Sequence, residues 1–359
     1  RNYCLFYARL DYACGVAVTV EKYKQITRSI EKWFSTEAQE FPWRCEDTPW
    51  GRLVSEFMAQ QTQIARVAER WPFVMERFPT PDRLAKSDEQ NILSLWQGLG
   101  YYRRAKHLKK AAEMIMHEFG GEVPDDVDAL MQLPGVGKYT AGAIASIAFG
   151  SREPIVDANV HRVLCRLWNH KEEWAPSKWT WKIAEQLVKA CNSPKVFNEG
   201  LMEFGAVICT PKSPACSDCP LQMNCSSYAK KTQDKVPPPK KSLQKKRVFH
   251  YAVVLQNGKK IAFERRADQG LWASMWQVPT IDSIEELSAK EVSVKLQLES
   301  PLIEMGIFEH VLSHRVVSFT VFSCKVGRDN RFSWFNQEAI KELPLASAQR
   351  KVLAVHCAT

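Results

Sequence analysis

Apolar residues recur at intervals of three and four positions along residues 22–228, which is the spacing of amphipathic helices. The most regular stretches are 53–78, 89–99 and 104–119, and glycine and proline residues separate them. We therefore expect residues 22–228 to form an all-α domain of about ten short helices.

The pattern changes after residues 229–247, a stretch rich in Lys and Arg with three consecutive prolines, which we interpret as a basic interdomain linker. Beyond it, alternating apolar and polar residues indicate strands. The expected elements are a β-hairpin at 248–266 that turns at Asn257-Gly258, a short helix at 284–292 and a strand at 316–326. Residues 248–359 should thus form an α+β domain.

Composition adds little to this picture but excludes some classes. A chain of 359 residues favours two domains, and 45% hydrophobic with 25% charged residues is typical of a soluble protein. The net charge of +9 weakly favours a polyanionic partner such as nucleic acid. No run of about 18 apolar residues is present to span a membrane. Residues 1–21 match neither a secretory signal nor a transit peptide, so we assign them no role. We expect the protein to be cytoplasmic and to act as a monomer.

The cysteines are unevenly distributed. Four of the eleven fall within 17 residues, at Cys209, Cys216, Cys219 and Cys225, and the others are scattered. An odd total with one tight cluster favours a metal site in a reducing compartment over a disulfide framework. Four thiolates can hold either a tetrahedral zinc ion or an iron–sulfur cluster, and their spacing alone does not decide between them.

The segment LPGVGKYT (133–140) is a glycine-rich turn between two helical patterns. We expect positive φ at Gly135 and Gly137, so that the N–H groups of Gly135, Val136, Gly137 and Lys138 form an anion socket beside a helix N-terminus. No strand precedes the turn, which excludes a nucleotide P-loop and favours a DNA phosphate. The alternative is a plain corner between helices, with glycines required for steric reasons.

Two carboxylates stand out. Asp157 directly precedes an amphipathic helix, where the simplest interpretation is an N-cap. Glu56 lies on a strongly apolar helical stretch, where burial would raise its pKa; the alternative is a surface-facing side chain. Asn159 and His161 follow Asp157, and either could have a phosphate-binding or a structural role.

Three motifs resemble those of the helix-hairpin-helix DNA glycosylases of the endonuclease III superfamily, and they occur in the expected order. Along the chain they are VSEFMAQQT (54–62), the LPGVGxxTA turn and the C-x6-C-x2-C-x5-C loop. Within that superfamily the chain is similar to the MutY family of adenine DNA glycosylases. The resemblance covers residues 22–228. It implies double-stranded DNA as partner and a [4Fe–4S] cluster on the four clustered cysteines, with zinc as the alternative.

The resemblance also implies roles for the two carboxylates. Glu56 would protonate the adenine and later activate water, while Asp157 would stabilise the positive charge that develops on the sugar. We include Asn159 among the candidate catalytic residues. Tyr139 stands where strand-cleaving relatives carry a Schiff-base lysine, so we expect base removal without strand cleavage. Lys138 is adjacent, but one helical residue turns a side chain by about 100°, so it should point elsewhere.

Further contacts are implied by the same family. Trp43, Arg44 and Glu199 are candidates for adenine recognition, and Gln61, Thr62 and Tyr101 for insertion into or contact with DNA. Ala59 departs from the usual leucine, which weakens any wedge role at that position.

The C-terminal half resembles the Nudix-like domain appended to MutY, through GLWASMWQVP (270–279). Glu285 and Glu286 do not form the carboxylate array of a Nudix hydrolase, so we expect no pyrophosphohydrolase activity. Residues 308–322 resemble the loop that reads 8-oxoguanine: Ser313 and His314 match it, whereas Leu312 replaces the usual phenylalanine. The alternative is an ordinary hairpin turn.

Taken together, these features predict a monofunctional glycosylase that removes adenine mispaired with 8-oxoguanine or guanine. Three rivals are a thymine-glycol-type glycosylase/lyase, a catalytically silent DNA-binding protein and a Nudix hydrolase. Tyr139 opposes the first, the pair Glu56 and Asp157 opposes the second, and the missing carboxylate array opposes the third.

Overall fold

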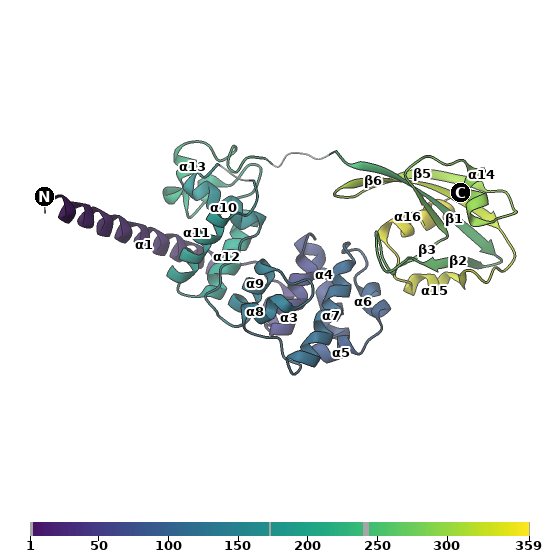
Figure 1. The fold of residues 1–359 in the computed structure, drawn as a ribbon, viewed down its shortest axis with the longest axis horizontal. Coiled ribbons are helices and arrows are strands. Elements are labelled where there is room, and N and C mark those ends of the chain that lie inside the picture. Colours follow the sequence, from purple (N-terminus) through teal and green to yellow (C-terminus); the bar gives the residue numbers. More distant parts are fainter. Residues whose placement is uncertain (1–2, 172–173, 240–243, 359) are drawn as a thin grey trace. The chain divides into compact units, whose positions relative to one another are not determined.

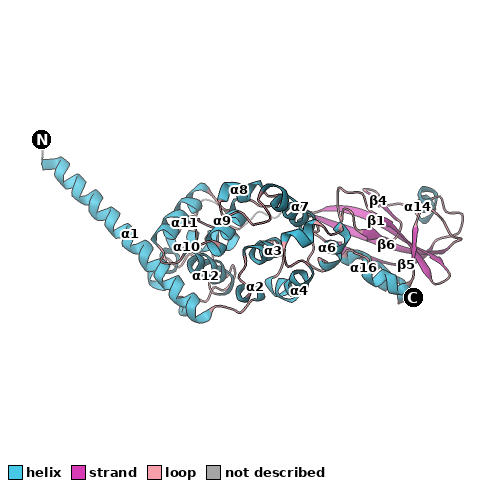
Figure 2. Ribbon diagram, turned by 90° about the horizontal axis from the view of Figure 1, so that it is seen from below, coloured by secondary structure: helices cyan, strands magenta, loops and turns pink. Residues whose placement is uncertain are grey.

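The computed structural model describes residues 3–171, 174–239 and 244–358, with side chains from residue 20 onward. Part of the predicted linker and most side chains of the predicted N-terminal extension lie outside the described residues. The chain forms two compact units, Arg1–Glu56 with Met114–Lys241 and Phe57–Glu113 with Ser242–Thr359. The strands of the described residues all belong to the second unit (Figures 1 and 2). No helix in the described ranges is long and apolar enough to cross a membrane.

The first unit is helical. Its elements are α1 (Tyr3–Glu37), α2 (Pro42–Cys45), most of α3 (Pro49–Ala59), the end of α7 (Arg103–Glu118), α8 (Val127–Gln132), α9 (Lys138–Ala148), α10 (Ala158–Trp168), α11 (Lys178–Ala190), α12 (Pro194–Val207), α13 (Ser226–Ala229) and the short 3-10 helices η1 (Cys216–Asp218) and η2 (Gln222–Asn224). The N-caps of α10, α11 and α12 are Asp157, Ser177 and Ser193, whose side chains accept a first-turn N–H. Apolar residues of α1, α10, α11 and α12 share one core.

The second unit begins with a group of helices: the last residues of α3, then α4 (Ile64–Arg77), α5 (Pro81–Ala85), α6 (Glu89–Leu95) and most of α7. The prediction of one helical run over 53–78 is wrong at its centre. The helix stops at Ala59 and restarts at Ile64, with Gln61 in the left-handed region at φ 55°. Local apolar spacing continues across the break, so periodicity alone does not reveal it.

A mixed sheet follows. Its strands are β1 (Lys246–Asn257), β2 (Lys260–Arg265), β3 (Trp276–Gln277), β4 (Thr280–Ser283), β5 (Ile303–Val311), β6 (Arg315–Lys325) and β7 (Ser333–Phe335). The sheet order is β3-β2-β1-β6-β5, in which β1 and β6 run parallel. The predicted hairpin is confirmed, with Asn257 paired to Lys260 across a turn that contains Gly258 at φ 57°.

Three helices accompany the sheet: α14 (Ala289–Leu296), α15 (Gln337–Glu342) and α16 (Ser347–Cys357). The helix predicted at 284–292 begins later, at Ala289, because Ser288 and Glu291 form a capping box there. In the described residues, thirteen α-helices precede the sheet, where about ten were expected. The difference arises from α2, α5 and α13, which span only four or five residues and leave no periodic pattern. The succession of an all-α and an α+β part is confirmed.

Candidate active site

Glu56 is buried near the middle of α3, with only 8% of its surface exposed. Its neighbours in sequence, Ser55 and Phe57, are also buried, so the helix faces protein on several sides. Burial raises the pKa of Glu56 to about 7. The surface-facing alternative is therefore wrong, and this carboxyl group can hold a proton near neutral pH.

Asp157 is the N-cap of α10, as its position in the sequence suggested. Its Oδ1 accepts the backbone N–H of Val160 at 2.6 Å, and its Oδ2 accepts the Asn159 amide at 3.2 Å. Burial raises the pKa of Asp157, while the Val160 N–H, the Arg162 charge and the Asn159 donors act in the opposite direction. Capping and a catalytic role are compatible, because the cap leaves the carboxylate fixed in place with its charge stabilised.

Tyr139 lies in the first turn of α9, facing the same carboxylates. Its hydroxyl donates to Sδ of Met202 at 2.9 Å and is also hydrogen-bonded with Glu56. Burial, reinforced by the charges of Glu56 and Asp157, raises the pKa of the Tyr139 phenol, so the hydroxyl stays protonated. Tyr139 and Met202 pack against a small apolar cluster formed by Ala143, Ile147 and Ile155. Glu56, Tyr139 and Asp157, which come from three separate helices, thus form one cluster.

The electrostatics of this cluster favour a divided role for its two acids. The charge of Asp157 adds to the burial that keeps Glu56 protonated, because two nearby carboxylates resist ionising together. Asp157 in turn accepts N–H donors that stabilise its ionised form. A buried acid with a raised pKa beside a second carboxylate that accepts N–H donors is an arrangement that enzymes use to cleave glycosidic bonds.

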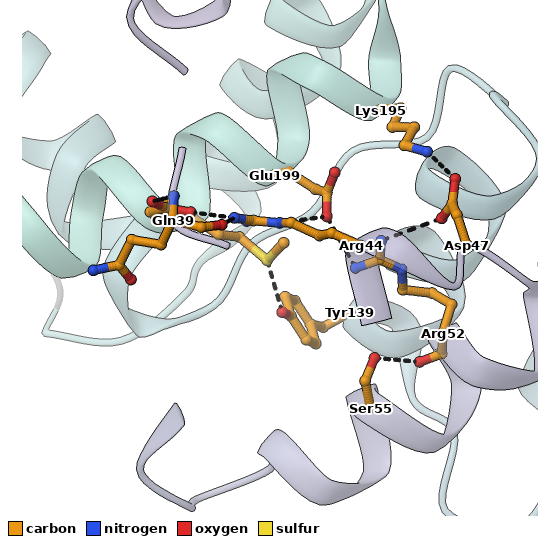
Figure 3. A network of polar contacts seen from close by, with 10 residues as sticks. Gln39, Arg44, Asp47, Arg52, Ser55, Tyr139, Lys195 and Glu199 are labelled. Carbon is orange, nitrogen blue, oxygen red and sulfur yellow. Dashed lines mark hydrogen bonds and ion pairs between the residues drawn. The ribbon is translucent and has the colours of Figure 1, made fainter. Parts of the chain in front are cut away.

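A set of ion pairs lies beside this cluster (Figure 3). Oε1 of Glu199 accepts from Nη1 of Arg52 at 2.9 Å and from Nε of Arg44 at 3.3 Å. Arg44 also contacts Oε2 of Glu203 at 2.8 Å. Both predicted polar adenine contacts, Arg44 and Glu199, are therefore engaged with each other. Trp43 is buried, with 5% exposure.

The environment of Trp43 and Arg44 is aromatic. The Trp43 ring stacks on Phe41 with centroids 4.8 Å apart. The Arg44 guanidinium lies 4.8 Å and 5.0 Å from the ring centroids of Phe34 and Phe41. The two rings and the ion pairs hold Arg44 in one orientation.

The glycine turn joins α8 to α9 but differs from expectation at one residue. Gly135 has φ 87°, as predicted, whereas Gly137 is extended, with φ −105° and ψ 178°. The prediction of positive φ at Gly137 is wrong because this residue is the N-cap of α9, a position that takes extended backbone. Val136 is buried between them. The Lys138 ammonium lies 4.2 Å from the ring centroid of Trp181, on α11. Its contact is therefore with this ring and not with Glu56 or Asp157.

The candidate DNA-inserting residues lie in the second unit, on two neighbouring turns. Gln61 and Tyr101 are exposed and adopt positive φ, 55° and 46°. Thr62 joins the turns by donating to the Leu99 carbonyl at 3.0 Å. The buried Arg104 strengthens the link: its donors reach carbonyls on α3 and on the turn before α7, at Phe57, Met58, Leu99 and Gly100. Tyr102, in contrast, is part of the core.

The four clustered cysteines line one cavity, together with Arg166. Nη1 of Arg166 lies 3.4 Å from Sγ of Cys209. Nowhere in residues 20–171, 174–239 or 244–358 do three His, Cys, Asp or Glu side chains converge closely enough to hold a single metal ion. The four thiols around one cavity are the groups that would hold a metal ion or an iron–sulfur cluster in this loop.

The candidate 8-oxoguanine residues lie at the turn between β5 and β6. Ser313 and His314 are exposed, with Ser313 Oγ 3.2 Å from Nδ1 of His314, and Leu312 is half-buried. The Leu312 N–H donates to the Arg315 carbonyl at 2.9 Å, which closes the turn. The turn thus presents two polar side chains to solvent.

Sequence reasoning missed two residues of the site, Arg52 and Met202. Arg52 precedes Glu56 by four positions, a spacing that places both side chains on one helix face. An arginine in the apolar run of α3 was therefore a detectable signal. Met202 left no signal, because a methionine on an apolar helix face is usually a core residue.

Two family models match the chain: "HhH-GPD superfamily base excision DNA repair protein" over residues 54–194 and "NUDIX domain" over residues 250–355. The human adenine DNA glycosylase is 30% identical over 400 residues, covering 91% of this chain and 73% of the relative. The rat adenine DNA glycosylase is 32% identical, with 92% and 77% covered. That of Mycobacterium tuberculosis is 42% identical over 193 residues, with 53% and 63% covered.

Solved structures agree with the fold of the helical part. A thermostable thymine-DNA glycosylase superposes with a TM-score of 0.55 at 32% identity, covering 59% of this chain and 99% of that one. Endonuclease III in a non-covalent complex with DNA gives a TM-score of 0.50 at 27% identity, covering 60% and 98%. Because relatives of 30% and 32% identity are matched over about three quarters of their own length and more than nine tenths of this chain, the chain belongs to the adenine DNA glycosylases, the N-glycosyl hydrolases of base excision DNA repair.

Proposed function

We propose that this protein is a monofunctional glycosylase that hydrolyses the N-glycosidic bond of adenine mispaired with 8-oxoguanine or guanine in double-stranded DNA. The observation that carries the proposal is the buried Glu56 carboxyl group, whose pKa is about 7 and which lies beside Asp157 and Tyr139. Such a group is half protonated near neutral pH, so it can act as an acid in one step and as a base in the next.

In the proposed reaction, protonated Glu56 donates its proton to N7 of the adenine, so that the base leaves as a neutral species. Bond cleavage leaves positive charge on the sugar, and the ionised Asp157 stabilises it from its fixed N-cap position. The Glu56 carboxylate then takes a proton from the attacking water. The Tyr139 hydroxyl, protonated throughout, orients Glu56.

Strand cleavage is not part of this reaction. An enzyme that cleaves the strand through a Schiff base needs an amine to attack the sugar, and the Tyr139 side chain has none. Lys138 is the nearest lysine in sequence, but its ammonium contacts the Trp181 ring. We therefore propose a product with an intact strand and an abasic site.

The adenine has to leave the helix to meet Glu56, which costs a few kcal/mol of stacking and pairing. In the proposed complex, Gly135, Val136, Gly137 and Lys138 bind a backbone phosphate through N–H groups and charge. Gln61, Thr62 and Tyr101 support the distorted duplex, since inserted side chains offset the lost stacking. Trp43, Arg44 and Glu199 surround the base, and Asn159 orients Asp157.

We assign residues 22–228 to the glycosylase domain, 229–247 to a linker and 248–359 to a Nudix-like domain that reads the opposite base. Within the last, Ser313 and His314 are the proposed polar contacts to 8-oxoguanine, and Leu312 the apolar one. All three lie on a single tight turn, on which Ser313 and His314 are exposed and Leu312 is half-buried. We propose that the protein acts as a monomer.

Cys209, Cys216, Cys219 and Cys225 are the residues that would hold a [4Fe–4S] cluster, which supplies a rigid, electron-rich centre for the loop. Arg162 and Arg166 hold this loop through the Cys209 carbonyl, at 2.8 Å and 3.3 Å. We propose that the cluster is structural for base removal, with the chemistry carried out by Glu56 and Asp157.

The decisive experiment is single-turnover cleavage of duplexes that contain adenine opposite 8-oxoguanine, guanine or thymine, analysed with and without alkali. We expect alkali-dependent breaks at adenine opposite 8-oxoguanine and guanine. Glu56→Gln should abolish base release and retain duplex affinity. Breaks without alkali would exclude the monofunctional mechanism, and full activity of Glu56→Gln would remove Glu56 from its role.

A further inference from the structure

Arg52 and Glu199 form an ion pair in the interior of the protein. The Arg52 side chain is 3% exposed and that of Glu199 is 4% exposed, and Nη1 of Arg52 lies 2.9 Å from Oε1 of Glu199 (Figure 3). The pair joins α3 to α12, and α3 also carries Glu56, one helical turn further on. A buried charge pair therefore lies directly beside the candidate acid.

This ion pair is poorly suited to stabilising a core. Nε of Arg52 has no hydrogen-bond partner among the described residues, although it is buried. Nη2 of Arg52 makes a long contact, 3.4 Å, with Oδ1 of Asp47. A buried ion pair with an unsatisfied donor usually contributes little to stability compared with apolar side chains of the same size. Its presence in a catalytic cluster thus favours a functional reason.

Four groups face the Glu56 carboxyl from the elements packed around it. Arg52 lies on the same helix, Glu199 on α12, Tyr139 on α9 and Asp157 at the start of α10. Apart from burial, the positive charge of Arg52 is the largest influence on the pKa of Glu56 and lowers it, and Glu199 is next and raises it. The two members of the ion pair therefore act on Glu56 in opposite directions.

We propose that the Arg52–Glu199 ion pair is a positioning element of the base-removal reaction, which sets the proton occupancy of Glu56 by balancing a positive against a negative charge beside it. Arg52 prevents Glu56 from being permanently protonated, so that it can later accept a proton from water. Glu199 offsets the charge of Arg52, so that Glu56 keeps the proton that it donates to the adenine. The inference rests on the proposed acid role of Glu56 and extends it to these two residues.

The rest of the network holds the pair in place. Arg44 donates to the same Glu199 oxygen from α2, and Lys195 pairs with Asp47, which in turn contacts Arg52. Arg44 thus holds Glu199 in place, and Asp47 holds Arg52. The largest charge effects on the pKa of Glu56 come from Arg52 and Glu199, the two members of the pair.

The test is the pH dependence of the single-turnover rate on adenine opposite 8-oxoguanine. In the wild type, the rate should fall as pH rises through the pKa of Glu56, because the acid loses its proton. Arg52→Gln removes a positive charge and should move this midpoint upward by about one pH unit. Glu199→Gln removes a negative charge and should move it downward by about the same amount. The double variant should return towards the wild-type midpoint.

Lys195→Gln is the matched control, because Lys195 is part of the same network but its side chain is 38% exposed and it is linked to Arg52 through Asp47. Its midpoint should equal that of the wild type. Glu199→Gln keeps the size and the acceptor oxygen of the native side chain, so it serves as the test if Arg52→Gln fails to fold. Unchanged midpoints in every folded variant, or shifts in the same direction, would overturn the proposal.

The outcome can be separated from that of the proposed function. If Glu56→Gln retains base release, the acid role itself is wrong and the midpoint reports another group. If Glu56→Gln is inactive while the Arg52 and Glu199 variants titrate like the wild type, only the role of the ion pair is refuted. A purely structural role would lower rates or affinity without opposite shifts of the midpoint.

Discussion

Nε of Arg162 donates to the carbonyl oxygen of Cys209 at 2.8 Å. The same guanidinium reaches Oδ1 of Asn159 through Nη2 at 2.9 Å, and Asn159 donates to Asp157 at 3.2 Å. The cysteine loop and the candidate catalytic carboxylate are thus joined by two side chains in succession, Arg162 and Asn159. A disturbance of the loop should therefore reach Asp157.

The first prediction concerns this loop. Cys219→Ser removes one thiolate of the candidate cluster, so we expect loss of iron, loss of broad visible absorption and weaker base release. Iron and sulfide analysis of the purified protein measures the first effect. Cys357→Ser, at an exposed cysteine of α16, is the control and should keep the full iron content. Normal iron content in Cys219→Ser would contradict the assignment.

The two roles of Asp157 can be separated by substitution. Asparagine keeps an oxygen that accepts the Val160 N–H, so Asp157→Asn should retain most of the stability but lose about two orders of magnitude or more in base release. Asp157→Ala should lose the same activity and, in addition, about 1 kcal/mol of stability. Thermal unfolding together with single-turnover rates distinguishes the variants. An active Asp157→Asn would leave this residue with a capping role alone.

Glu56 should make stability depend on pH. Its pKa rises from 4.5 to about 7 on folding, so its contribution is complete below pH 4.5 and is lost as pH rises through 7. Glu56→Gln cannot ionise, and we expect it to be more stable than the wild type at pH 8 by up to about 3 kcal/mol. Denaturant unfolding at pH 5 and pH 8 measures the difference. If the stability difference between Glu56→Gln and the wild type is the same at pH 5 and pH 8, the pKa of Glu56 is not raised by folding.

The glycine turn offers a matched pair of substitutions. Gly135 has φ 87°, so Gly135→Ala should cost about 1 kcal/mol and weaken duplex binding. Gly137 is extended, and a Cβ placed there meets no atom within 4 Å, so Gly137→Ala should fold like the wild type. Calorimetry and duplex titration test both variants. Equal losses at the two positions would contradict the backbone geometry that distinguishes them.

The turn at Ser313 should affect the choice of opposite base rather than the chemistry. Ser313→Ala removes one exposed hydroxyl, and we expect the preference for adenine opposite 8-oxoguanine over adenine opposite guanine to fall by up to about tenfold, in line with one lost hydrogen bond. The ratio of rates on the two duplexes is the measurement. A parallel loss on both substrates would point to a general role in binding DNA.

Much of the candidate site was visible in the chain because its signals are local. The N-cap at Asp157 depends on the helix that directly follows it, and the positive φ of Gly135 depends on the turn that contains it. Gly137 was misjudged for the opposite reason, since the helix began one residue earlier than the pattern suggested and placed this glycine in the extended cap. The break at Gln61 was missed because apolar spacing continues on both sides of it.

The sequence by itself determined which chemical groups are present: a carboxylate on an apolar helix, a carboxylate before a helix, a tyrosine after a glycine turn and four clustered thiols. Only the tertiary structure decided how far each group is buried and which partners it meets. Desolvation and the charge of Glu199 raise the pKa of Glu56, and both depend on helices that are distant in the chain, whereas Arg52, which lowers this pKa, lies on the same helix. Burial and through-space charge are properties of the folded protein, so no local pattern can encode them.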